Sequence, residues 1–231
     1  MRKAAISTRA VACGIDLGAT DLWIVGLTEE ATPDVAFAEH LHIDEFERLA
    51  DILGHASTVA IDAPGGFSEG SHIGDERFAR KFQRARCSEV ALRRRGIAVP
   101  FATPMRTEPL PPWMNVGFET WRVAKTAAPT VVETFPHAIF WRLAGRELKH
   151  KYRADGRAAR RAVLAPLVNL PAGVSFWPHD ALDALACAVL AHRVLVGDAE
   201  EISCAGDLAW HAHDGSAMWL PHLTAHLSAA D

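Results

Sequence analysis

The stretch Cys13–Trp23 reads CGIDLGATDLW and joins two apolar runs of the chain. Such near-continuous apolar runs are typical of strands that are buried on both faces. Asp16 ends the first run, and Gly18 supplies a turn before the second begins. We predict strands at 11–17 and 22–28, paired antiparallel through this short turn. A carboxylate at the end of a buried strand suggests the anchor of an acidic metal-binding site.

Length and composition favour one large α/β domain. The chain has 231 residues, of which 49% are hydrophobic and 23% charged, and its net charge is −4. These values suit an ordinary core and argue against a strongly basic scaffold. The four cysteines form no CxxC pair, which excludes the common zinc-knuckle and redox motifs. Without an 18-residue apolar run or an apolar secretion signal, we expect a cytoplasmic protein that does not enter membranes.

Hydrophobic periodicity and turn signals predict the remaining elements. Strands are expected at 35–42, 58–61 and 130–135, with a terminal hairpin at 208–211 and 217–220. Helices are expected at 44–53, 78–95, 117–128, 138–144, 156–167 and 179–196. The first three strands, a helix and strand 58–61 form a ββαβ unit, with 58–61 parallel to 11–17. We therefore expect a flexible N-terminus at 1–10 and one domain at 11–225, with an inserted helical and loop region at about 67–128.

Four further acids resemble Asp16 in their context. Asp62 follows an apolar strand, and Glu133 lies within another. Asp180 and Asp183 are three residues apart at the start of the last strong helix, so they face the same way. Clustered carboxylates repel one another unless a cation neutralises them, and oxygen ligands suit Mg²⁺ or Mn²⁺. The pattern predicts an acidic catalytic site built from these residues.

Simpler explanations exist for some of these acids. Asp180 also suits the N-cap of its helix, and Asp62 before Ala-Pro also suits the start of a turn. Asp183 lies inside a helix between apolar neighbours, and Glu133 lies in an apolar strand. Neither an N-cap nor a turn explains Asp183 or Glu133, which strengthens the interpretation of the five acids as a site.

Positive charge is concentrated in two short segments. Residues 77–95 and 142–161 hold eight Lys or Arg each, which is 16 of the 24 in the chain. Two explanations are equally good. The residues lie on solvated helix faces, or they form a basic rim that binds phosphates beside the acids. Few aromatic residues interleave with them, which gives base stacking little support. The candidate phosphate or nucleic-acid contacts are Arg86, Arg93, Arg94, Lys149, Lys151, Arg157 and Arg160.

The motifs GIDLGATDLW, AIDAPGG, VVETFP, HDALDALACAVLA and MWLP, in this order, resemble the domain of unknown function 429 family. That family is predicted to be nuclease-like with an RNase H fold, and the resemblance covers roughly residues 11–221. It implies a mixed α/β sheet of five strands, with strands 1–3 antiparallel, strands 4 and 5 parallel to strand 1, and helices on both faces. In the wider superfamily, which includes Holliday-junction resolvases, acids on strand 1, strand 4 and the final helix bind the metals.

By this resemblance Asp16, Asp62 and Asp183 are the metal ligands, with Asp180 assisting. Resolvases commonly have Glu on strand 4, so the shorter Asp62 implies a different metal geometry. The function implied is a metal-dependent nuclease or phosphodiesterase, a hydrolase that acts on nucleic acid with two Mg²⁺ or Mn²⁺ ions.

Two other functions stay open. The segment 16–20, DLGAT, also resembles the first phosphate motif of sugar kinases and actin-like ATPases, which would make the protein an ATP-dependent phosphotransferase. Those proteins duplicate the domain, and no second copy is visible in this sequence. A non-catalytic binding module with the same fold is the other alternative, and the intact acids argue against it. Asp183 favours the nuclease over both.

Overall fold

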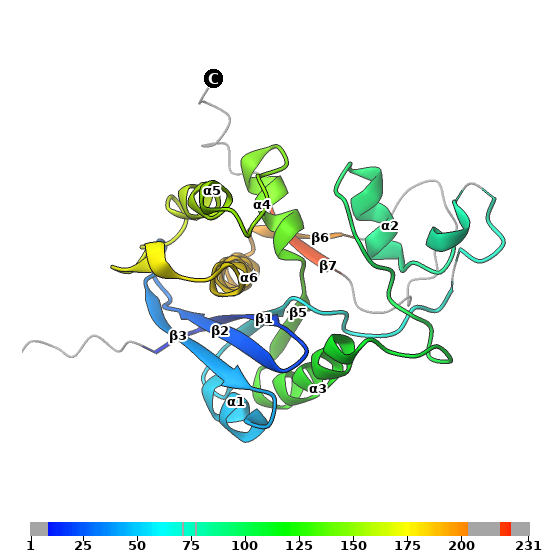
Figure 1. Cartoon of the computed structure of the whole chain (residues 1–231). Helices are drawn as coiled ribbons and strands as arrows, with labels where there is room; N and C mark the ends of the chain where they lie inside the picture. The colour runs from blue at the N-terminus through cyan, green and yellow to red at the C-terminus, as the bar shows by residue number, and fades with distance from the viewer. Residues whose placement is uncertain (1–8, 71, 77, 203–217, 223–231) are drawn as a thin grey trace, which may run out of the picture.

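The computed structural model describes residues 9–70, 72–76, 78–202 and 218–222, apart from the side chain of residue 81. A single seven-stranded sheet with the order β3-β2-β1-β4-β5-β7-β6 forms its centre (Figure 1). The strands are β1 Ala12–Leu17, β2 Asp21–Leu27, β3 Val35–His42, β4 Thr58–Ile61, β5 Thr130–Glu133, β6 Ala199–Ile202 and β7 Met218–Pro221.

The pairing of the strands confirms the predicted RNase H-like fold. β1 and β2 are antiparallel, and β2 and β3 are antiparallel. β4 lies parallel to β1, and β5 lies parallel to β4. The helical connection between β3 and β4 allows this parallel return, because a tight hairpin joins only antiparallel strands.

The sheet has seven strands rather than the five expected. The predicted strand at 217–220 is β7, which pairs in parallel with β5 and antiparallel with β6. The predicted strand at 208–211 lies outside the described residues. β6 reads AEEI and carries no apolar alternation, because it is an edge strand with partly solvated acids. One of them, Glu200, accepts a hydrogen bond from Arg142 at 2.6 Å.

Helices cover both faces of the sheet, as predicted. Figure 1 shows α1 and α3 against one face and α4, α5 and α6 against the other. The bounds are α1 Phe46–Leu53, α2 Cys87–Arg94, α3 Pro112–Ala127, α4 Pro136–Ala144, α5 Ala154–Leu164 and α6 His179–Leu195, with short 3₁₀ turns at Arg80–Phe82 and Val174–Phe176. Two apolar cores result, one on each side of the sheet.

The predicted helix at 78–95 was wrong in its first half. The regular helix α2 begins only at Cys87, after the 3₁₀ turn Arg80–Phe82. The Glu89 side chain accepts a hydrogen bond from the Arg86 backbone N–H at 3.0 Å, which caps the helix at this point. The hydrophobic spacing that favoured one continuous helix therefore does not locate the residue at which the helix begins.

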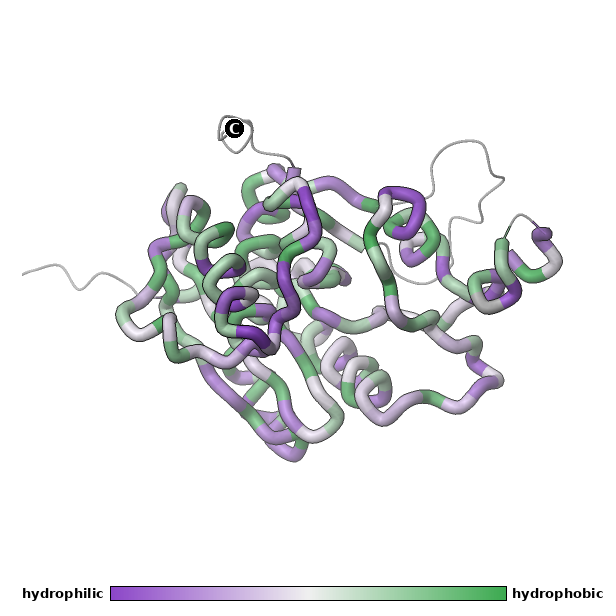
Figure 2. The backbone as a smooth tube through the Cα atoms, turned by 45° about the horizontal axis from the view of Figure 1, so that its top comes forward, coloured by the Kyte–Doolittle hydropathy of each residue, from purple (hydrophilic) through white to green (hydrophobic). Residues whose placement is uncertain are grey.

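Helix α6 lies unusually close to β1, and this contact positions the acids described below. A Cβ atom at Gly14 would lie 2.0 Å from the backbone nitrogen of Ala188, so only glycine permits this distance. Residues 181–192 of α6 are all buried. In Figure 2 the outer segments mix hydrophilic and hydrophobic residues. Among the described helices, none has the length and apolar character needed to span a membrane.

Candidate active site

Asp16 and Asp62 meet at one edge of the sheet. Asp16 lies near the end of β1, and Asp62 follows β4 directly. Because these strands are parallel, with Ile15 beside Ile61, their carboxyl ends emerge together. The Asp62 backbone N–H donates to the Ile15 carbonyl at 2.9 Å. Burial and then the charge of the nearby Asp62 carboxylate raise the pKa of the Asp16 carboxyl, so the two side chains lie close enough to repel each other when both are charged.

The first turns of α6 bring two more carboxylates to this point. Oxygen atoms of Asp16, Asp180 and Asp183 all lie within 4.8 Å of one another. Asp16 is 7% exposed and Asp183 is 3% exposed, whereas the Asp180 side chain is 41% exposed. Three carboxylates this close supply oxygen ligands of the kind that Mg²⁺ and Mn²⁺ prefer. The donor set therefore fits a divalent cation.

Burial makes the charged forms of these acids unfavourable. It raises the pKa of Asp16 well above its ordinary value, and the nearby charges of Asp62 and Asp183 raise it further. Burial likewise raises the pKa of Asp62 to about 7. The pKa of Asp183 is raised by burial, with Lys151 opposing the rise. A cation that joined the cluster would reverse these shifts, because it stabilises the deprotonated carboxylates.

Lys151 is the cation that the chain itself supplies. Its Nζ lies 2.7 Å from Asp183 Oδ2 and 3.8 Å from Asp180 Oδ1. Burial alone would lower the pKa of Lys151, but attraction to Asp183 and Asp16 raises it overall, so the ammonium stays charged. The sequence indicated a phosphate contact on a basic rim, whereas the structure brings this residue into the acidic cluster.

Glu133 is paired differently from the other predicted acids. It is 1% exposed, and both of its carboxylate oxygens accept hydrogen bonds from the guanidinium of Arg86, one of them at 2.8 Å. The Gly65 backbone N–H also donates to Glu133 at 2.8 Å. Glu133 thus anchors the turn that follows Asp62, and it does not join the group formed by the oxygens of Asp16, Asp180 and Asp183. Arg86 is fully buried against Glu133, so the prediction of a phosphate contact at this residue is wrong.

The other predicted basic contacts divide by exposure. Lys149 and Arg94 are exposed, and Arg93 and Arg157 are half-buried. Lys149 pairs with Asp155 at 2.9 Å. Arg160 is only 4% exposed, and its guanidinium donates to the carbonyls of Lys149 and Gly156 at 2.8 and 3.1 Å. The basic rim of the prediction is therefore partly an interior feature, because the Arg160 side chain of α5 is buried in the fold.

A cleft of about 480 Å³ opens at the acidic cluster. Asp62 and Asp183 contribute to its wall, together with the cations Lys151 and Arg160. Its remaining lining residues are Ala98, Pro100, Phe135, Pro136, His137, Glu147, Leu148, His150 and Tyr152. Sequence reasoning missed the aromatic members, although His150, Lys151 and Tyr152 are consecutive. That short run of aromatic and basic residues was the available signal.

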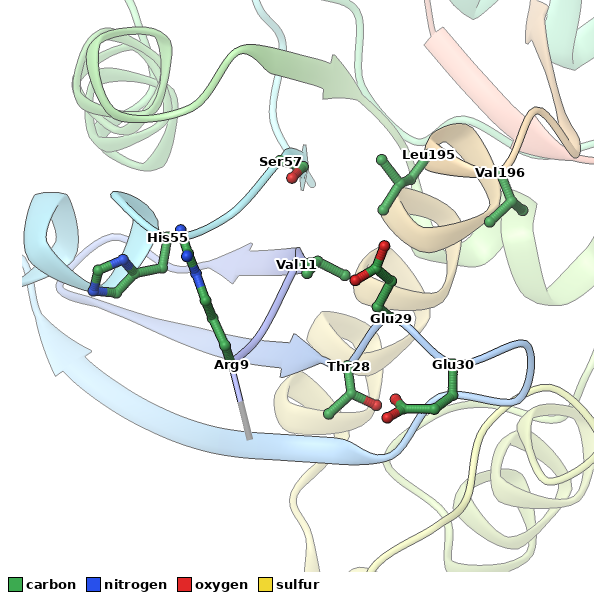
Figure 3. A pocket seen from close by; sticks show the side chains of 9 residues that line it. All are labelled: Arg9, Val11, Thr28, Glu29, Glu30, His55, Ser57, Leu195 and Val196. Carbon is green, nitrogen blue, oxygen red and sulfur yellow. The ribbon is translucent and has the colours of Figure 1, made fainter. Parts of the chain in front are cut away.

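A second cavity, of about 630 Å³, lies elsewhere (Figure 3). Val11 and Ser57, which line it, precede β1 and β4, whereas the acidic cluster lies where these strands end. The side chains of Arg9, Glu29 and Glu30 also line this cavity. The two cavities are therefore at opposite ends of the parallel strands.

Comparisons with known proteins give structural neighbours and a family match. The structure aligns with "Thermus thermophilus RuvC structure" at 16% identity and a TM-score of 0.46, covering 89% of this chain and 98% of that chain. It also aligns with "T. thermophilus RuvC in complex with Holliday junction substrate" at 17% identity and a TM-score of 0.41, covering 80% and 95%. A comparison with curated proteins gives no match. Residues 14–206 match the family described as "Protein of unknown function (DUF429)", and the chain therefore belongs to the DUF429 family.

Proposed function

We propose that this protein is a metal-dependent nuclease that hydrolyses phosphodiester bonds of nucleic acid by a two-metal mechanism. One observation carries the proposal: oxygen atoms of Asp16, Asp180 and Asp183 lie within 4.8 Å of one another. Bound Mg²⁺ or Mn²⁺ ions would stabilise the attacking and leaving oxygens of the phosphodiester. Asp16, Asp62 and Asp183 would hold these ions, with Asp180 assisting.

The burial of these carboxylates supports a catalytic role over a merely structural one. Burial that raises the pKa of Asp16, Asp62 and Asp183 makes their charged forms unfavourable in the fold, and such costs are typical of functional sites. Asp183 extends from a helix whose neighbouring residues are fully buried, so its position is rigid. A rigid ligand keeps the reacting phosphate in register with the attacking group.

Cations beside the acids would hold the substrate. Lys151 lies against Asp183 and would remain within reach of a phosphate oxygen when a metal neutralises that carboxylate. Arg160 lines the same cleft, and in the part of the chain described it pairs with backbone carbonyls rather than with a carboxylate. Phosphate recognition favours such a cation, because the guanidinium offers several donors in a fixed plane.

The test is a cleavage screen over single-stranded, duplex and branched nucleic acids with Mn²⁺ or Mg²⁺. We expect metal-dependent cleavage by the native chain and its loss in Asp183→Asn, which keeps the shape of the side chain and removes its charge. Asp51→Asn is the matched control, because Asp51 is exposed on α1. Full cleavage by Asp183→Asn would refute the assignment, and so would cleavage that survives chelation of the metal.

The phosphotransferase alternative has its own measurement. It needs a second copy of the domain to enclose ATP, and the described residues form one sheet. Calorimetry with ATP and Mg²⁺ separates the two functions. Tight, Mg²⁺-dependent ATP binding would favour phosphotransfer, and its absence together with cleavage would favour the nuclease.

A further inference from the structure

Three aromatic rings from two distant segments contact one another at tilted angles beside the acidic cluster. The Tyr152 ring lies 5.0 Å from the His150 ring, at an interplanar angle of 30°, and 4.3 Å from the His179 ring. Tyr152 is nevertheless 66% exposed, and it is the single tyrosine of the chain. An aromatic ring that is held by neighbours and open to solvent is a ready surface for stacking, because few rotamers are left to lose on binding.

The exposed ring borders the cleft rather than an isolated surface. Tyr152 and His150 line it together with Phe135 and Pro100. The volume of about 480 Å³ lies within the roughly 300–1,000 Å³ range of small-molecule sites. Most such sites combine apolar and aromatic walls with a few polar groups that fix the orientation of the ligand. The cleft therefore suits a flat, partly apolar group.

Charge on the same wall specifies what that flat group is attached to. Arg160 and Lys151 line the cleft, and Arg160 is almost fully buried. Among the described residues its hydrogen-bond acceptors are the backbone carbonyls of Lys149 and Gly156. Burial lowers the pKa of Arg160, so an anion in the cleft would stabilise its charged form. A planar aromatic ring joined to an anion is the chemistry of a nucleotide.

We propose that the cleft binds an unpaired nucleobase, stacked on Tyr152, of the nucleotide whose phosphate lies at the acidic cluster. The placement of the phosphate rests on the proposed function, whereas the base site rests on the exposed Tyr152 ring, its two aromatic neighbours and the cleft. A base inside a duplex is covered on both faces by its neighbours, so it offers no face to a protein ring. The preferred substrate is therefore single-stranded or locally unpaired nucleic acid, and a fully paired duplex is disfavoured.

The base site is tested by binding, without any need for cleavage. The full chain carrying Asp183→Asn is titrated against a fluorescent single-stranded oligonucleotide and against its matched duplex, and anisotropy is recorded. We expect the single strand to bind more tightly. Adding Tyr152→Ala should weaken single-strand binding by roughly 5- to 150-fold, as loss of one base–aromatic stack does, with little effect on the duplex. Tyr152→Phe keeps the ring and should retain the affinity.

Controls separate stacking from general damage. Phe176→Ala removes a ring that is 89% exposed and does not line the cleft, so single-strand affinity should stay unchanged. Melting temperatures of the Tyr152 variants should match the parent, because the side chain is mostly solvated. In a series of oligonucleotides that each carry one abasic position at a different place along the strand, only one should bind more weakly than the others. Equal binding at every register would contradict the proposal.

The outcomes distinguish this proposal from the nuclease assignment. Binding that depends on Tyr152 without any metal-dependent cleavage by the native chain would support the base site and overturn the proposed function. Cleavage by the native chain with unchanged affinity in Tyr152→Ala would support the nuclease and overturn the base site. No measurable single-strand binding, or equally tight duplex binding, would also overturn the base site.

Discussion

We expect Asp62→Asn to stabilise the metal-free protein at pH 7.5 and above, although the residue belongs to the proposed catalytic site. Burial raises the pKa of Asp62 from 3.8 to about 7, so between these two pH values the folded chain keeps a proton there that the unfolded chain has released. Stability from this group is therefore fully present below pH 3.8 and is lost as the pH rises toward 7. Asparagine is neutral at every pH and avoids this loss.

The size of the effect follows from the shift. A rise from 3.8 to about 7 corresponds to roughly 4 kcal/mol of unfolding free energy. Asp62 is partly exposed on the wall of the cleft, and water there reduces the penalty, so we expect roughly 2–4 kcal/mol. For a chain of this length that gain corresponds to a rise in melting temperature of roughly 5–15 °C.

The assay is urea unfolding with a chelator present, at half-unit steps from pH 4 to pH 8.5. The difference between Asp62→Asn and the native chain should be small near pH 4, grow to pH 7 and then level off. Asp51→Asn, on the exposed face of α1, should stay within about 0.5 kcal/mol of the native chain throughout. A pH-independent difference, or a variant less stable than the native chain at pH 8, would refute the reasoning.

Three further outcomes follow from other contacts. Arg86→Met should cost roughly 3–5 kcal/mol in urea unfolding because Glu133 would stay buried without its cation, and an unchanged midpoint would contradict that pairing. Gly14→Ala should lower the free energy of unfolding by roughly 1–3 kcal/mol or more, or fail to give soluble protein, because its Cβ would lie 2.0 Å from the Ala188 nitrogen. Native stability of this variant would exclude the close approach of α6 to β1. Millimolar Mn²⁺ should raise the melting temperature of the native chain and not of Asp183→Asn, as scanning calorimetry would record, and equal rises would place the ion elsewhere.

The sequence was most informative where a local pattern also describes a tertiary position. Asp16 and Asp62 each follow a buried apolar run, and parallel strands that end together bring such residues to one edge. Asp183 was identified from an acid among apolar neighbours in a helix. Gly14 permits that helix to lie close to β1, and this close packing brings Asp183 to the strand ends that carry Asp16 and Asp62.

Elsewhere the same local reasoning failed, because a side chain's partner lies far along the chain. Arg86 reads as part of a basic segment, yet its partner Glu133 is 47 residues away and buries it completely. Lys151 reads as a surface cation, yet Asp183 draws it into the acidic cluster from 32 residues away. Charge composition describes how many cations a segment has, and it does not describe which way they point.

The antiparallel pairing of β1 with β2, the parallel return of β4 beside β1 and the acids at the strand ends were predicted from the sequence alone, whereas helices on both faces were implied by the family resemblance. Apolar periodicity and turn residues specify these features locally, since they follow from which faces must leave water. The pairing of Glu133 with Arg86, the ion pair of Lys151 with Asp183 and the ring contact of Tyr152 with His179 were decided only by the tertiary structure. Each is a contact between side chains from separate segments, and its geometry exists only after the core has packed.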